Sequence, residues 1–287
     1  MKCNICPRQC NIDRDKSKGF CGENNIIRIS KVMFHHWEEP FISGDENEKG
    51  SGAIFFTGCN LKCVYCQNDP ISHGGKGEEI TIQNLVDIIK ELERGGALNI
   101  NLVTPTHFAN KIIEALKIYK PKIPIVWNSS GYETLEMLDK VKDYVDIFLV
   151  DLKYMDNDLA FRYSKAPNYV ETATECIKKM RKIQPQDIFE NGLMKKGVVI
   201  RHLVLPTHTQ DSINCLNFIY ENFGTETFVS IMSQYEPRYN AVNYKEINRK
   251  ITPLEYKRVV NHALKLGMKN ALVQDLSSAD SKYTPEF

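Results

Sequence analysis

The sequence predicts an α/β fold built on a parallel sheet. From residue 53 onward, short apolar runs alternate with amphipathic stretches at helical spacing, as βα units require. The apolar runs are nearly continuous, which is typical of strands buried on both faces. Residues 1–50 lack this alternation and hold four of the nine cysteines, which sets them apart as an N-terminal extension. The pattern suits a doubly wound sheet and a barrel equally well.

We expect six βα units. The expected strands lie at 53–57, 99–103, 123–127, 145–150, 198–204 and 228–232, with a candidate seventh at 271–274. The expected helices lie near 81–94, 107–119, 133–142, 169–183, 211–222 and 253–266. Thr81 is placed to cap the first helix, and its apolar residues form one stripe. We expect a cysteine-rich, metal-binding extension at 1–50 and the main domain at 51–287.

The composition points away from charged partners. Lys and Arg total 37 against 36 Asp and Glu, so the chain has no excess charge that would attract nucleic acid or an anionic membrane. The start of the chain lacks a signal-peptide pattern, and no apolar stretch is long enough to cross a membrane. We therefore expect a cytoplasmic protein. Nine cysteines in a reducing compartment indicate metal or redox chemistry.

The stretch TGCNLKCVYCQN follows the first expected strand and holds Cys59, Cys63 and Cys66. Three thiolates on one loop could bind three irons of a four-iron cubane and leave the fourth iron open, as a catalytic metal centre requires. The alternatives are a zinc site completed by His73 and a set of unrelated thiols.

Four further cysteines lie near the N-terminus, namely Cys3, Cys6, Cys10 and Cys21. Four ligands within nineteen residues are enough to close a tetrahedral site. Their spacing differs from that of a zinc ribbon, so structural zinc, an auxiliary [4Fe–4S] cluster and unligated thiols all stay open. A short segment without its own core needs such a metal to fold.

The Cys-x3-Cys-x2-Cys motif, with Tyr65 before its last cysteine, resembles that of the radical S-adenosylmethionine (SAM) superfamily. The resemblance implies a partial (β/α)6 TIM-like barrel and a [4Fe–4S] cluster whose unique iron is chelated by SAM. It also implies reductive cleavage of SAM to methionine and a 5′-deoxyadenosyl radical, which abstracts a hydrogen atom from the substrate.

Other stretches extend the resemblance over most of the chain, namely EEPFISG (38–44), NINLVTPTHF (99–108) and VDLKY (150–154). Together with the cysteine loop they are similar to the pyruvate formate-lyase activating enzyme-like branch. This likeness implies a flavodoxin- or ferredoxin-type reductant and, as one target, a glycyl radical enzyme. A small molecule or a peptide is the second target, and a non-catalytic iron–sulfur or zinc protein is a third interpretation.

One departure from the superfamily concerns the amino group of SAM. Many members carry Gly-Gly-Glu after the second strand, whereas this chain has Thr104-Pro105-Thr106-His107 there. We expect Thr104 and Thr106 to meet the SAM ammonium and His107 to point into the cavity. Alternatively, His107 caps the helix that follows.

Polar residues at the ends of later strands complete the predicted SAM site. Asn128 and Ser129 follow the third strand, where a simple turn is the alternative. Asp151 and Lys153 follow the fourth strand, where a surface ion pair is the alternative. Arg201 lies within the fifth strand and needs an anionic partner, either SAM or an internal Asp. Side-chain alternation sends Arg201 and His202 to opposite faces of that strand.

Overall fold

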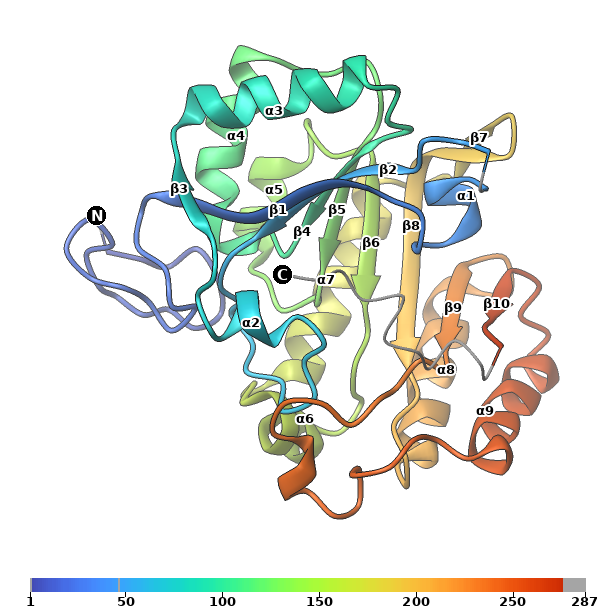
Figure 1. Ribbon diagram of the computed structural model, residues 1–287. Helices are drawn as coiled ribbons and strands as arrows, with labels where there is room; N and C mark the ends of the chain where they lie inside the picture. Colours follow the sequence, from blue (N-terminus) through green and yellow to red (C-terminus); the bar gives the residue numbers. More distant parts are fainter. Residues whose placement is uncertain (1, 46, 276–287) are drawn as a thin grey trace.

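The structure is a computed structural model that describes residues 2–45 and 47–275. Seven parallel strands form most of a ten-stranded sheet, in the order β10-β9-β8-β6-β5-β4-β2 (Figure 1). They are β2 (Ser51–Phe56), β4 (Ile100–Val103), β5 (Ile125–Ser129), β6 (Ile147–Asp151), β8 (Leu193–Leu203), β9 (Phe228–Met232) and β10 (Ala271–Val273). Antiparallel pairs add β1 (Ile27–His35) and β3 (Glu78–Ile80) beyond β2, and β7 (Ile188–Glu190) beside β8.

The predicted partial barrel is confirmed. All six expected strands occur, and the candidate seventh strand is β10. β3 and β10 are the two ends of the sheet and do not pair with each other, so the barrel stays open across the part of the chain that the structure describes. β8 begins at Leu193, earlier than the expected 198, because its first residues pair with β7.

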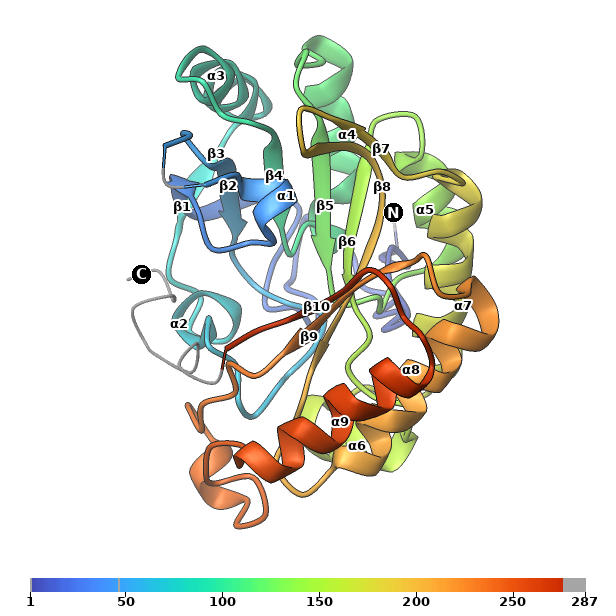
Figure 2. The same cartoon turned by 90° about the vertical axis from the view of Figure 1, so that its right-hand side faces the viewer.

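The expected helices are present on the outer face of the sheet, where α4, α5 and α7 lie together in Figure 2. They are α3 (Ile82–Arg94), α4 (Ala109–Ile118), α5 (Leu135–Val141), α7 (Tyr169–Ile183), α8 (Thr209–Phe223) and α9 (Pro253–Lys265). The sequence did not indicate the short elements α1 (Pro40–Ser43), α2 (Asp69–Ser72), α6 (Asn157–Ser164), η1 (Thr106–Phe108) and η2 (Ala241–Asn243). Of the helices in the described ranges, none combines the length and the apolar character needed to span a bilayer.

The interior of the barrel is filled at one end and open at the other. Side chains alternate along each strand, so every second residue points inward. Val126, Leu149 and Val199 pack inside with Ile42 of α1, which closes the end of the barrel where the strands begin. Free space therefore lies at the carboxyl ends of the strands.

The N-terminal extension is joined to the sheet through β1. This strand pairs with β2 from Ile29 and Phe56 to His35 and Ser51. The described residues before β1 form loops, with an isolated bridge between Lys2 and Asp13. The division of the chain at residue 50 stays a prediction, and the end of the expected main domain, 276–287, lies outside the described residues.

The start of α3 provides a test of the predicted helix cap at Thr81. The Thr81 hydroxyl accepts a hydrogen bond from the Asn84 N–H (3.1 Å), and the Asn84 side chain accepts one from the Thr81 N–H (3.0 Å). Replacing Thr81 with Ala removes the first bond, so we expect the free energy of unfolding to fall by about 1 kcal/mol in urea titrations. Thr81→Ser keeps the hydroxyl and should stay near wild type. Equal stability of the Ala and Ser variants would contradict this capping role.

Candidate functional site

A pocket of about 250 Å³ lies at the carboxyl ends of the parallel strands. Its walls come from the ends of these strands, the loops that follow them and the segment after β1. Barrels of this kind hold their active sites at this end. Of the residues predicted from the sequence, the walls include Cys59, Cys63, Tyr65, Cys66, Thr104, Thr106, Asn128, Ser129, Asp151, Lys153 and Arg201.

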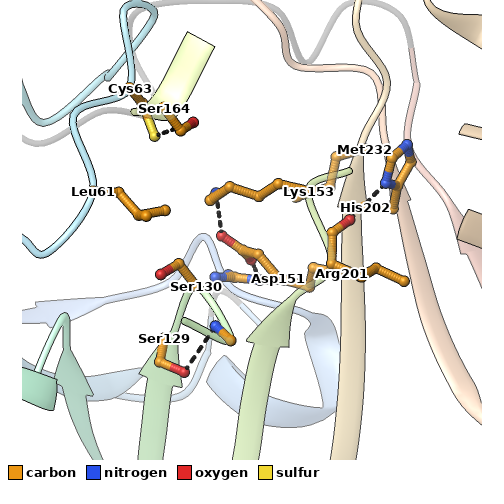
Figure 3. Close-up of polar contacts among 12 residues, drawn as sticks. Leu61, Cys63, Ser129, Ser130, Asp151, Lys153, Ser164, Arg201, His202 and Met232 are labelled. Atoms are coloured by element: carbon orange, nitrogen blue, oxygen red, sulfur yellow. Dashed lines mark hydrogen bonds and ion pairs between the residues drawn. The ribbon is translucent and has the colours of Figure 1, made fainter. Parts of the chain in front are cut away.

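The three cysteines of the loop between β2 and α2 are free thiols that face this pocket. Cys63 is buried, and its sulfur lies 3.0 Å from the Ser164 hydroxyl at the end of α6 (Figure 3). Burial raises the pKa of Cys59 to about 11 and that of Cys66 to about 12. Thiols that are this hard to ionise become thiolates when a metal displaces the proton.

The backbone of the cysteine loop is fixed to segments on both sides of it. The Cys59 N–H donates to the Cys21 carbonyl (3.2 Å), and the Lys62 N–H donates to the Ser164 carbonyl (2.9 Å). Gly58 starts the loop with φ +81°, and a Cβ at this position would lie 2.7 Å from the Cys21 carbonyl oxygen. Only glycine meets both demands, because it tolerates positive φ and has no side chain.

Tyr65 is held by a chain of hydroxyl groups. Its hydroxyl lies 2.5 Å from that of Tyr154, which lies 2.8 Å from the Ser164 hydroxyl. Burial raises the pKa of both tyrosines, so they stay neutral. Because Ser164 also contacts Cys63, the chain of hydroxyl groups connects two residues of the cysteine loop through the segment after β6 and the end of α6.

A network of charged side chains lies beside the cysteine loop, with Arg201 at its centre. The Arg201 guanidinium donates to Asp151 (2.8 Å), Glu38 (2.7 Å) and Asn128 (2.8 Å). Lys153 donates to the other oxygen of Asp151 (2.7 Å), so Asp151 lies between two cations (Figure 3). Burial would raise the pKa of Asp151, but Arg201 and Lys153 outweigh it and keep the pKa below its usual value. The carboxylate is therefore charged.

The alternation expected along β8 is observed. Arg201 points into the barrel and lines the pocket, whereas His202 is buried on the other side of the strand. The Nδ1 atom of His202 lies 2.7 Å from the Leu152 carbonyl oxygen, and burial lowers the pKa of this histidine to about 4. His202 is thus neutral and braces the end of β6.

Glu38 is a pocket residue that the sequence did not single out. One of its oxygens accepts hydrogen bonds from Asn101 (2.9 Å) and Asn128 (3.0 Å), and the other accepts from Arg201. Glu38 follows β1 and is far from these partners in the sequence. A signal was present, since Glu38 and Glu39 stand directly before the apolar start of α1, and an acid in such a place needs a partner.

Thr104 and Thr106 lie in the pocket wall after β4. Thr104 has φ +58°, a left-handed conformation that is unfavourable for a β-branched residue, and its N–H donates to the Asn128 carbonyl (2.9 Å). Thr106 donates its hydroxyl to the buried Glu133 (2.9 Å). Such strained backbone is typical of functional sites.

His107 lies behind the cysteine loop and outside the walls of the pocket. Its Nε2 atom lies 2.7 Å from the Thr57 carbonyl oxygen, at the end of β2. Burial lowers the pKa of His107 to about 3, so the ring is neutral and donates this hydrogen bond. The side chain thus holds the start of the loop.

The four N-terminal cysteines are free thiols within one group of loops. Burial raises the pKa of Cys6 to about 12, and Cys21, Cys10 and Cys3 are all close enough to raise it further. A Cβ built on Gly19 would lie 3.5 Å from the Cys21 sulfur and 3.6 Å from the Cys10 sulfur. The group adjoins the pocket loop through the Cys21 carbonyl.

Neither set of cysteines converges on a single point. Among the described residues, no three His, Cys, Asp or Glu side chains stand in the arrangement that one metal ion requires. A cubane differs from a single ion, because each thiolate binds a different iron and the sulfurs stay apart. Three free thiols on one loop that line one pocket therefore suit an iron–sulfur cluster better than zinc.

The family model of the radical SAM superfamily matches residues 53–219, which is more than half of the 287-residue chain. The chain belongs to the radical SAM superfamily. Membership implies a [4Fe–4S] cluster and SAM as cofactors, and it supports SAM-dependent radical chemistry.

Sequence relatives of this superfamily member include two curated proteins. An uncharacterized protein of Methanocaldococcus jannaschii is 32% identical over 278 residues, covering 93% of this chain and 75% of that protein. The pyruvate formate-lyase-activating enzyme of Clostridium pasteurianum is 25% identical over 219 residues, covering 70% of this chain and 82% of that enzyme.

Solved structures share the fold of this radical SAM protein. SuiB of Streptococcus suis bound to SAM has a TM-score of 0.51 and 15% identity, covering 75% of this chain and 47% of that chain. Methylornithine synthase has a TM-score of 0.53 and 14% identity, covering 75% of this chain and 60% of that chain. The present chain is therefore shorter than both, and the likeness concerns the fold alone.

Glu38 provides a test of the charge network. Glu38→Ala leaves Arg201 and the two Asn amides with unpaired buried donors, so we expect the free energy of unfolding to fall by about 3 kcal/mol. Urea unfolding measures this loss. Glu221→Ala removes an exposed carboxylate from α8 and should change stability by less than about 0.5 kcal/mol. A Glu38 variant as stable as the Glu221 variant would contradict the role of the network.

Proposed function

We propose that the pocket is the active site of a radical SAM enzyme in which Cys59, Cys63 and Cys66 each bind one iron of a [4Fe–4S] cluster. The observation that supports this proposal is that these three thiols line one pocket, while no fourth cysteine of the described residues does. Three ligands leave one iron open for SAM. When bound, the cluster and SAM supply reductive cleavage to methionine and a 5′-deoxyadenosyl radical, which takes a hydrogen atom from the substrate.

Lys153 is the residue that we assign to the SAM carboxylate. Its ammonium group is turned into the pocket and donates to Asp151, which leaves two more N–H donors for an anion. Arg201 already donates to Asp151, Glu38 and Asn128, so in this proposal it orients these side chains rather than contacting SAM.

The remaining predicted residues surround the pocket with polar groups. Tyr65, Thr104, Thr106, Asn128 and Ser129 lie in its walls. We assign Thr104 and Ser129 to the other polar groups of SAM, and Tyr65, Thr106 and Asn128 to shaping the walls, because their side-chain polar atoms already have hydrogen-bond partners. The backbone of Thr104 supports this assignment. Its positive φ costs stability, and such strained residues cluster at functional sites.

The proposed target is a glycine Cα–H bond of a partner protein, as in activation of a glycyl radical enzyme. The likeness to the activating enzyme of Clostridium pasteurianum supports it. A second hollow of about 300 Å³ supports it too, because Trp37, Glu38 and Gln234 line both this hollow and the main pocket on the open side of the barrel. Deuterium transfer into 5′-deoxyadenosine from labelled protein, peptide or small-molecule candidates distinguishes the targets.

The proposed setting is the cytoplasm, with a flavodoxin- or ferredoxin-type protein as the electron source. All nine cysteines are free, which suits a reducing compartment.

We also propose that Cys3, Cys6, Cys10 and Cys21 hold an auxiliary iron–sulfur cluster; zinc, the alternative, would require their sulfurs to converge on one point. Four thiols within one group of loops support this proposal. The hydrogen bond from the Cys59 N–H to the Cys21 carbonyl joins this group to the pocket loop, which suits both a structural support of that loop and an electron relay. Zinc and iron analysis of the purified protein distinguishes the two metals.

Replacing Cys63 with Ala tests the proposed function. The variant loses one of three cluster ligands, so after anaerobic reconstitution we expect no 5′-deoxyadenosine above background with SAM and dithionite. Cys215→Ala removes a buried thiol of α8 outside the pocket and should leave SAM cleavage intact. Wild-type cleavage by the Cys63 variant would contradict the ligand assignment. Wild-type protein with an intact cluster but without 5′-deoxyadenosine would contradict the radical chemistry.

A further inference from the structure

A third hollow, of about 730 Å³, lies on the outer side of the cysteine loop and is separate from the two hollows described above. Lys62 and Val64, which flank Cys63, form its floor, and the end of α6 and the segment around η2 form its sides. The Val64 N–H donates to the Tyr163 carbonyl (2.8 Å), and the Lys62 N–H donates to the Ser164 carbonyl (2.9 Å). The loop is therefore a fixed wall with the proposed cluster site on one side and this hollow on the other.

The hollow is positively charged. Lys62, Arg162 and Lys165 line it, and no carboxylate does. Neither lysine forms an ion pair with a carboxylate of the described residues. Arg162 donates to Glu246 (2.9 Å), which neutralises part of its charge and fixes its position, and its side chain stays 53% exposed. A net positive surface of this kind suits an anionic partner.

Lys62 links the hollow to the cysteine loop. It stands directly before Cys63, and its side chain lines the hollow. Burial together with the charge of Lys62 lowers the pKa of His73 to about 4. His73 is thus neutral, and it stacks on the exposed Tyr239 with ring centroids 4.9 Å apart. The cationic rim therefore also carries an aromatic surface.

We propose that this hollow is the docking surface for an acidic one-electron carrier protein. The inference rests on the proposed function, because it requires a cluster on the far side of the loop. One electron leaves the carrier and enters the oxidised cluster, so the carrier is oxidised and the cluster reduced by one electron, and no bond or proton moves. A carrier bound here is separated from the cluster by the cysteine loop alone. SAM and the substrate can occupy the pocket on the other side of the loop at the same time.

A protein fits this surface better than a small anion does. Lys62, Arg162 and Lys165 come from two separate segments and line a hollow of about 730 Å³, a volume far larger than one phosphate or carboxylate group fills. Spread cations of this kind accelerate association with a broad acidic surface. Arg162 also packs on the Tyr244 ring, 5.2 Å from its centroid, which holds one cation in place before the partner arrives.

Charge reversal tests the surface. In the double variant Arg162→Glu/Lys165→Glu we expect 5′-deoxyadenosine formation driven by reduced flavodoxin, used as an acidic carrier, to fall at least about tenfold at low ionic strength. With dithionite, a small reductant that needs no docking, the rate should equal that of wild type. Flavodoxin binding, measured by calorimetry on the same proteins, should weaken by a similar factor. In wild type, added salt should slow the flavodoxin-driven reaction.

Two further variants keep the test decisive. Lys165→Gln removes one charge with little disturbance and should give a smaller loss of the same kind. Lys117→Glu reverses an exposed lysine of α4, away from the hollow, and should match wild type with both reductants. Wild-type flavodoxin rates in the double variant, or equal losses with both reductants, would overturn the docking surface. Wild-type protein that cleaves no SAM even with dithionite would instead contradict the proposed function.

Discussion

The position of one loop controls the rest of the site. Three thiols that are to serve one cluster must be presented from a single short segment, and that segment has to be stiff. Gly58 allows the chain to turn against the Cys21 carbonyl, and the end of α6 accepts hydrogen bonds from the backbone of the loop. The N-terminal extension and α6 therefore pack on either side of the same loop, and both are needed to hold the cysteines at the mouth of the barrel.

The charge network follows from strand alternation within an open barrel. Apolar residues such as Val126 and Leu149 fill the interior below, and two residues further along the same strands come Asn128 and Asp151. Buried polar groups at this level must satisfy one another, and Glu38 from the segment after β1 completes the set. The segment that follows the antiparallel strand β1 thus contributes to the pocket as directly as the parallel strands do.

The parallel fold and the cysteine loop could be predicted because both depend on local patterns. Continuous apolar runs define strands, and the Cys-x3-Cys-x2-Cys spacing lies within ten residues. The sequence indicated that Glu38 needs a partner but not which one, because its role depends on an antiparallel pairing of β1 with β2 that brings distant residues together. The position of His107 was also beyond the sequence, since a single turn of η1 decides whether the ring faces the cavity or the Thr57 carbonyl. The short α6 lacks a long apolar stripe, so the second support of the loop was missed.

In our proposal, the cluster in the pocket has one iron free for SAM. Electron paramagnetic resonance of the anaerobically reduced protein, recorded with and without SAM, tests it most directly, because direct coordination alters the electronic environment of the cluster. We expect SAM to shift the [4Fe–4S]⁺ signal of the wild-type protein. Identical spectra in the presence and absence of saturating SAM, from protein with a full cluster, would contradict it.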